Sequence, residues 1–116
     1  MNRSPAWQPA TLEAVAEVVA LLDGARLAAD AATAGDPLSP WANVAVSVHL
    51  AAAGLRCFLR WPPDARMVGS CQDCLHAAAE ALTQLQAVSS LPADELIQTR
   101  GWLATALADT RRLSRP

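Results

Sequence analysis

Four stretches of the chain carry apolar residues at alternating spacings of three and four, and this pattern constrains the fold more than any other feature. Such spacing places the apolar side chains on one face of an α-helix. The two clearest rows are Trp41, Val44, Val48, Ala51, Leu55 and Phe58, and then Val68, Cys71, Leu75, Ala78, Leu82 and Leu85. The first stretch offers Leu12, Val15, Val19 and Leu22, flanked by Val18 and Leu21, and the last offers Leu96, Thr99, Leu103, Ala106, Thr110 and Leu113. An average period of 3.5 residues is typical of packed helical bundles, so we predict an all-α protein.

Proline and glycine mark the ends of the first two helices. The first helix is predicted over residues 10–34 and ends at Gly35. The second opens on Ser39 as its N-cap, with proline at the first helical position, and runs to about Trp61, where two prolines stop it.

The third helix is predicted over residues 64–89, with Ser70 as an alternative start, and the fourth begins at residues 90–92 and ends near Leu113. Short connections make neighbouring helices antiparallel. We therefore predict an up-down-up-down antiparallel four-helix bundle over residues 10–116, preceded by a short extended N-terminal arm over residues 1–9.

Composition supports this class. A chain of 116 residues favours one domain. Alanine, the best helix former, is abundant, and Ile97 is the only isoleucine. All nine basic residues are arginine, a bias typical of GC-rich bacterial genomes. No export signal is visible, so we expect a bacterial, cytoplasmic protein with reduced thiols.

The charge balance bears on partners. The net charge is -2 and the pI is about 5.5, which disfavours a nucleic-acid partner, since those proteins need a basic face. The longest apolar stretch, residues 41–61, is interrupted by His49, Arg56 and Arg60, so we expect no membrane span.

The segment SCQDCLH at residues 70–76 is the most suggestive local pattern. Cys71 and Cys74 lie on the same side of a helix, whereas His76 lies about 200° from Cys74 and cannot share a metal with both cysteines. If a hairpin turns near residue 64, Cys57 falls level with Cys71. Three readings stay open: structural thiols, a disulfide or redox switch, and a zinc or copper site formed by Cys57, Cys71 and Cys74.

The helix start decides the chemistry of the first of these cysteines. If the helix begins at Ser70, Asp73 completes a capping box and Cys71 lies in the first turn. The helix dipole would then lower the pKa of the Cys71 thiol and make it reactive.

His49 is the second candidate. In an antiparallel hairpin it falls level with Asp23, and an Asp23–His49 hydrogen bond would satisfy a half-buried imidazole. The stretch from His49 to Gly54 loosely resembles the motif of histidine-containing phosphotransfer domains, although Ala52 stands where that motif has a basic residue. The resemblance implies an exposed histidine that accepts phosphate.

No catalytic constellation is visible. We therefore expect a non-enzymatic helical bundle that acts through protein–protein contacts or self-association, in an accessory, regulatory or structural role. Aromatic side chains are enriched at interfaces, so Trp7 and Trp102 are candidate anchors, while Trp41 and Trp61 equally suit the ends of the core.

Two alternatives remain. One is a metal- or redox-responsive module on the three cysteines. The other is a nucleic-acid-associated bundle, because the architecture and the alanine-rich second helix are broadly similar to those of HEPN bundles. The short Arg-to-His motif of that family is not matched, since Arg66 stands ten residues before His76.

Overall fold

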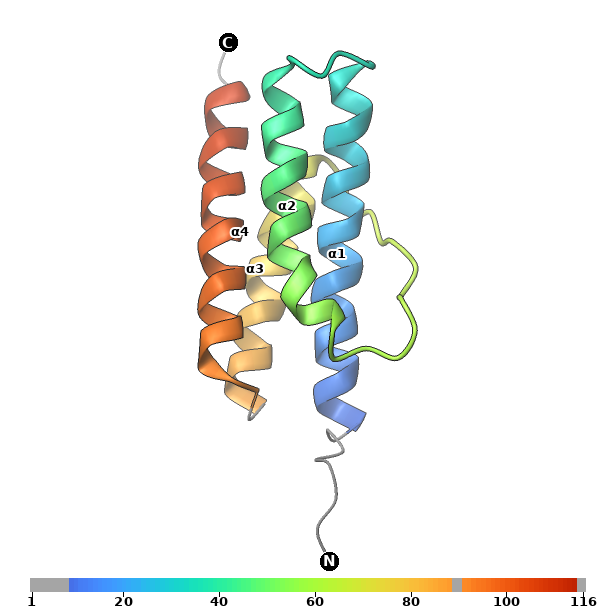
Figure 1. The fold of residues 1–116 in the computed structure, drawn as a ribbon, viewed down its shortest axis with the longest axis vertical. Helices are drawn as coiled ribbons and strands as arrows, with labels where there is room; N and C mark the ends of the chain where they lie inside the picture. Colours follow the sequence, from blue (N-terminus) through green and yellow to red (C-terminus); the bar gives the residue numbers. More distant parts are fainter. Residues whose placement is uncertain (1–8, 89–90, 115–116) are drawn as a thin grey trace, which may run out of the picture.

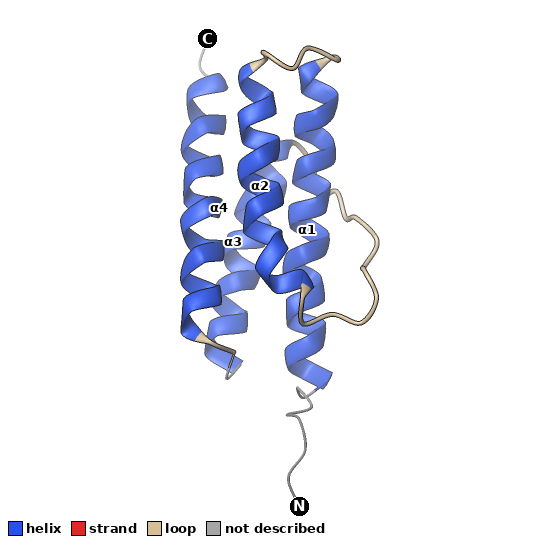
Figure 2. Ribbon diagram, viewed as in Figure 1, coloured by secondary structure: helices blue, strands red, loops and turns tan. Residues whose placement is uncertain are grey.

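The computed structural model describes residues 9–88 and 91–114, which form four helices with no strand among them (Figure 2). The helices are α1 (Pro9–Thr33), α2 (Pro40–Arg56), α3 (Cys71–Val88) and α4 (Ala93–Leu113). The prediction of an all-α protein with four helices is confirmed. The predicted N-terminal arm lies outside the described residues, apart from Pro9, which belongs to α1.

Local signals fix the turn between α1 and α2. The chain leaves α1 through Ala34 and Gly35, whose φ angles of 51° and 81° lie in the left-handed region. The N–H of Trp41 donates to Oγ of Ser39 at 3.2 Å, so Ser39 is the N-cap of α2, as predicted. Proline at the next position lacks the N–H that a helix start leaves unpaired.

The order of the helices in space differs from the prediction. In Figure 1 the chain rises through α1, descends through α2, descends again through α3 and rises through α4. α1 contacts α2 and α3, and α4 contacts the same two helices. The diagonal pairs, α1 with α4 and α2 with α3, are not direct neighbours within the described part of the chain. The predicted up-down-up-down order is therefore wrong, although every contacting pair is antiparallel.

The connection between α2 and α3 explains this topology. α2 ends at Arg56 instead of Trp61, and α3 begins at Cys71 instead of residue 64. Residues 57–70 form a long loop that passes along the outer side of α1 before α3 begins (Figure 1). A long crossover connection can join two helices that run in the same direction, whereas a short turn cannot.

The loop is docked on α1 by its backbone. The N–H of Arg66 donates to the carbonyl oxygen of Ala20 at 2.9 Å, and the Arg66 guanidinium pairs with Glu17. A Cβ atom at Gly24 would lie 2.0 Å from the carbonyl oxygen of Arg66. Glycine at this position lets the loop approach the helix backbone. Gly24 therefore permits the docking of the loop that connects α2 to α3.

The four predicted apolar rows supply most of the core. Apart from Leu12, which is partly buried, and Val68, their members are buried or packed against the core. Val68 is 43% exposed because it lies in the loop and not in α3. Two buried threonines interrupt the row of α4, and Oγ1 of Thr110 donates to the carbonyl oxygen of Leu107 at 2.8 Å.

None of the helices in residues 9–88 and 91–114 is both long enough and apolar enough to cross a lipid bilayer.

Candidate functional site

The N-terminus of α3 is capped by its own side chains. The N–H of Asp73 donates to Oγ of Ser70 at 3.1 Å, and the N–H of Ser70 donates to Oδ2 of Asp73 at 3.0 Å. These are the two bonds of a capping box, and they confirm the alternative start at Ser70. The bond from the Ser70 backbone, and then the Ser70 side chain, hold the pKa of Asp73 below its ordinary value.

Cys71 does not have the reactive character that a first-turn cysteine would gain from the dipole. Its side chain is buried in the core, with 6% exposure. Burial, and then the neighbouring Cys74, raise the pKa of Cys71 to about 11. The expectation of a lowered pKa is wrong because the loss of hydration outweighs the field of the helix terminus. Cys71 is therefore a protonated, apolar core residue at neutral pH.

The three cysteines do not come together. Cys57 caps the C-terminus of α2 and is exposed, whereas Cys71 and Cys74 are buried in α3, and all three are free thiols. α2 ends low in Figure 1 and α3 begins well above that level. Cys57 would lie level with Cys71 only if residues 57–71 formed a helical hairpin, and the chain forms a long loop there instead. No group of three His, Cys, Asp or Glu side chains in the described ranges is arranged to hold a metal ion.

His49 is exposed on α2, and Asp23 has a different partner. Nη1 of Arg56 donates to Oδ2 of Asp23 at 3.1 Å, and the second guanidinium nitrogen pairs with the other carboxylate oxygen. The predicted Asp23–His49 bond is wrong, because the arginine seven residues further along α2 reaches the carboxylate. The bidentate pair ties α1 to α2.

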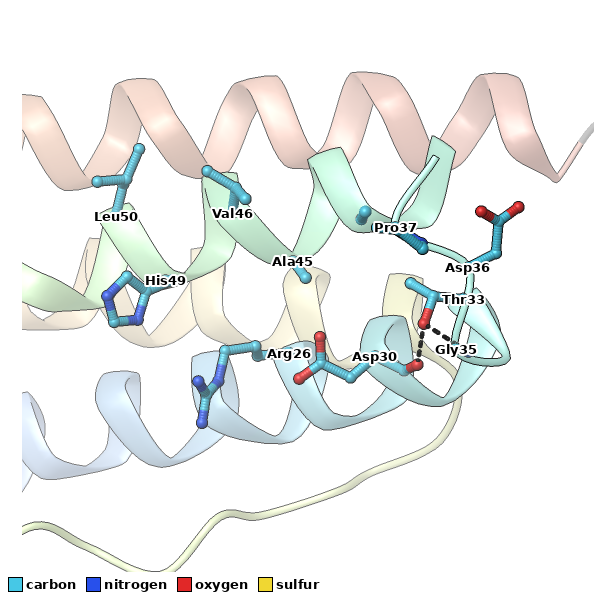
Figure 3. A pocket seen from close by; sticks show the side chains of 11 residues that line it. Arg26, Asp30, Thr33, Gly35, Asp36, Pro37, Ala45, Val46, His49 and Leu50 are labelled. Atoms are coloured by element: carbon cyan, nitrogen blue, oxygen red, sulfur yellow. Dashed lines mark hydrogen bonds between the residues drawn. The ribbon is translucent and has the colours of Figure 1, made fainter. Parts of the chain in front are cut away.

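Beside His49 lies an open cavity of about 620 Å³ between α1 and α2, close to the turn that joins them (Figure 3). Ala42 and Ala45 leave the space unfilled because their side chains are small. This volume lies within the range typical of small-molecule sites. The sequence did not predict this cavity, because no sequence motif marks a place where small side chains leave space between two alanine-rich helices.

The charged residues of the cavity come from both helices. Arg26 and Asp30 lie on α1, Asp36 lies in the turn and His49 lies on α2. The Nε atom of Arg26 is buried and has no hydrogen-bond partner in the described part of the chain. An unpaired donor of this kind is a departure from the rule that buried polar groups are satisfied.

The tryptophans divide between core and surface. Trp41 is partly buried against the core, as one of the two readings predicted. Trp61 is 78% exposed in the loop, so its assignment to the end of the core is wrong. Trp102 is 40% exposed on α4, and Trp7 lies outside the described residues, so the structure does not test either as an anchor.

The side of α4 opposite its core row carries a second row at spacings of 3, 4, 3, 4 and 3. We call this row the outer face of α4, and its exposed members are Asp94, Ile97, Gly101, Ala104, Ala108 and Arg111. Ile97 is 64% exposed. Nothing lies within 4 Å of the position that a Cβ of Gly101 would occupy.

The outer face of α4 could have been found in the sequence. Its spacing is the same as that of the core row, and Gly101 is the only glycine of α4. Within the described chain, no neighbouring residue packs against Gly101.

The chain matches no protein-family model, no curated protein and no solved structure.

Proposed function

We propose that the protein is a non-enzymatic module that acts through protein–protein contacts, and that the outer face of α4 is its contact surface. The observation that carries this proposal is the exposed outer face of α4, in which Ile97, Ala104 and Ala108 are apolar and Gly101 lies near the centre. A helix that serves only its own bundle needs one apolar face, whereas α4 also exposes Ile97 among small residues on its opposite side.

Gly101 strengthens the case. A glycine in the middle of a helix costs about 1 kcal/mol relative to alanine, and no contact within the described chain requires it. The absence of a side chain allows another helix to approach closely, as glycine does wherever two backbones meet. A partner helix that packs at Gly101 would give this costly residue a purpose.

A second copy of the chain fits the same face. When two α4 helices are laid antiparallel about the midpoint of Trp102 and Leu103, Gly101 meets Ala104 of the partner subunit and Ile97 meets the partner's Ala108. In antiparallel helix pairs with this spacing, the first residue of the seven-residue repeat on one helix packs against the fourth residue of the repeat on the other helix.

The charges at the ends agree with this register. Asp94 in the first turn meets Arg111 of the partner subunit, and the reciprocal pair forms at the other end. The antiparallel dipoles of the two helices also attract. The contact is small, since α4 is about 30 Å long and presents a narrow row. We therefore expect a weak, concentration-dependent dimer in place of a permanent one.

Charge exchange tests the register. In sedimentation equilibrium, Asp94→Arg and Arg111→Asp should each weaken association at least fivefold, because each sets like charges against each other. The double variant should recover most of the affinity. Each single change also opposes the dipole of α4, so helicity is checked by circular dichroism. The double variant carries both dipole penalties, so its recovery is specific to the pairing.

A matched pair of surface variants tests the face itself. Ile97 and Val46 are 64% and 57% exposed, on α4 and α2 respectively. Ile97→Glu should abolish association, and Val46→Glu should leave it unchanged. A mass of one chain for the wild type at high concentration would overturn the proposal, as would equal effects of the two variants.

A further inference from the structure

We propose that the cavity between α1 and α2 binds a small carboxylate with an apolar body, held by Arg26 and His49 at its charged end and by Ala45 and Val46 along its body. This site is separate from the outer face of α4, because α1 and α4 lie on opposite corners of the bundle. It does not depend on the proposed function.

Arg26 supplies the strongest reason. It lines the cavity and forms no ion pair with any described residue, although Asp30 stands one turn away on the same helix. Its Nε–H is buried and has no acceptor among the described residues. A bound carboxylate that draws the guanidinium toward the cavity would accept two of its hydrogens. It would thereby supply the hydrogen-bond acceptor that Arg26 lacks in the free protein. Planar, bidentate recognition of carboxylates is the characteristic chemistry of arginine.

His49 faces the same space from α2. It is exposed, and no described residue forms a hydrogen bond with it. In Figure 3 the imidazole of His49 and the side chain of Arg26 project from facing helices at one end of the cavity. An imidazole N–H is a second donor for the same carboxylate.

The remaining lining fixes the orientation of the ligand. Asp36 lies toward the other end of the cavity, beside the turn, and Ala45 lies between the two ends (Figure 3). The carboxylate of Asp36 would repel a ligand carboxylate at the turn, which leaves the Arg26 end for the charged group. Most of the exposed lining between the charges is apolar, with Val46 itself 57% exposed, so an apolar body gains from covering it.

The test uses octanoate as the probe, with acetate and octylammonium as matched controls for the apolar body and the charge. Binding is followed by the backbone amide shifts of the ¹⁵N-labelled protein. Octanoate should produce saturable shifts that map to the cavity, acetate should bind at least tenfold more weakly, and octylammonium should not saturate the same amides.

Variants separate the roles of charge and shape. Arg26→Leu should weaken octanoate at least tenfold, and Arg26→Lys should weaken it less, because the charge remains and the planar fork is lost. Ala42→Leu should block binding by filling the cavity while the charges stay. Arg100→Leu, on α4, is the control and should bind like the wild type. If Arg26→Leu does not fold, the octanoate affinities of Arg26→Lys and Ala42→Leu still test the proposal.

Any one of several results would overturn the proposal. These are the lack of saturable shifts with octanoate, shifts that map to another face, and equal binding of octylammonium and octanoate. Undiminished binding to Ala42→Leu would also overturn it.

Discussion

Of the three glycines that lie inside the described helices, Gly24 and Gly101 have opposite surroundings. A Cβ at Gly24 would collide with the backbone of Arg66, whereas a Cβ at Gly101 would meet open space. Gly24→Ala should therefore destabilise the protein by about 1–3 kcal/mol, since a docked backbone has to move. Gly101→Ala should stabilise the isolated chain by up to about 1 kcal/mol through helix propensity.

Urea unfolding at low protein concentration, where α4 is unpaired, measures both changes. Stabilisation by Gly24→Ala would show that the loop is not held against α1. In the dimer, Gly101→Ala should weaken association, which separates its two effects.

The buried thiol of Cys71 predicts a fall in stability at alkaline pH. Its pKa is raised from an ordinary value of 9.0 to about 11. Between these values the unfolded chain has lost this proton and the folded chain retains it. Stability should therefore be fully present below about pH 9 and fall as pH rises toward 11, by at most about 1.4 kcal/mol per unit. The chain has no lysine and no tyrosine, so few other groups titrate in this window.

Thermal or urea unfolding from pH 8 to 11 measures this slope, and Cys71→Ala should flatten it. An unchanged slope in that variant would contradict the assignment. At neutral pH a thiol reagent should modify the exposed Cys57 first, with Cys71 protected until the protein unfolds.

At the scale of the helices, the Asp23–Arg56 ion pair joins α1 to α2. The side chains of Asp23 and Arg56 are 13% and 31% exposed. Arg56→Met should cost about 1–3 kcal/mol, because it leaves a largely buried carboxylate without a partner.

The control is Arg112→Met, which removes the Arg112–Asp109 ion pair. The arginine of that pair is 73% exposed, so the free energy of unfolding should change by less than about 1 kcal/mol. Chemical denaturation of the two variants compares these pairs directly. Equal costs would mean that the Asp23–Arg56 pair contributes no more than a surface pair.

Element positions were largely readable from the sequence. The core row of α4 and the N-cap of α2 were predicted correctly, because both depend on residues close together in the chain. The start of α3 was assigned too early, since Val68 happens to continue the row by three residues. The capping box of Ser70 and Asp73, after Gly69 with a φ of 142°, overrides that periodicity. Local hydrogen bonding decides a helix end where periodicity alone is ambiguous.

At the scale of the whole molecule, the topology could not be predicted in the same way. It depends on contacts between residues far apart in sequence, such as Arg66 with Ala20 and Gly24. A sequence with the pattern of two helices joined by a turn is as compatible with the up-down-up-down order as with the order that the chain adopts. The cavity beside Arg26 and His49 escapes prediction for a related reason, since it arises from how two helices pack and not from a pattern in either.

The self-pairing of α4 is the central claim of this account, and spin-label distances between subunits test it most directly. In a Cys57→Ser background, labels at Thr105→Cys and at Arg112→Cys are measured separately at concentrations where the dimer forms. In the antiparallel register the separation along the helix axis between the label and its partner copy should be about 20 Å greater for residue 112 than for residue 105. Equal distances for the two labels, or no dipolar coupling at either, would contradict the claim.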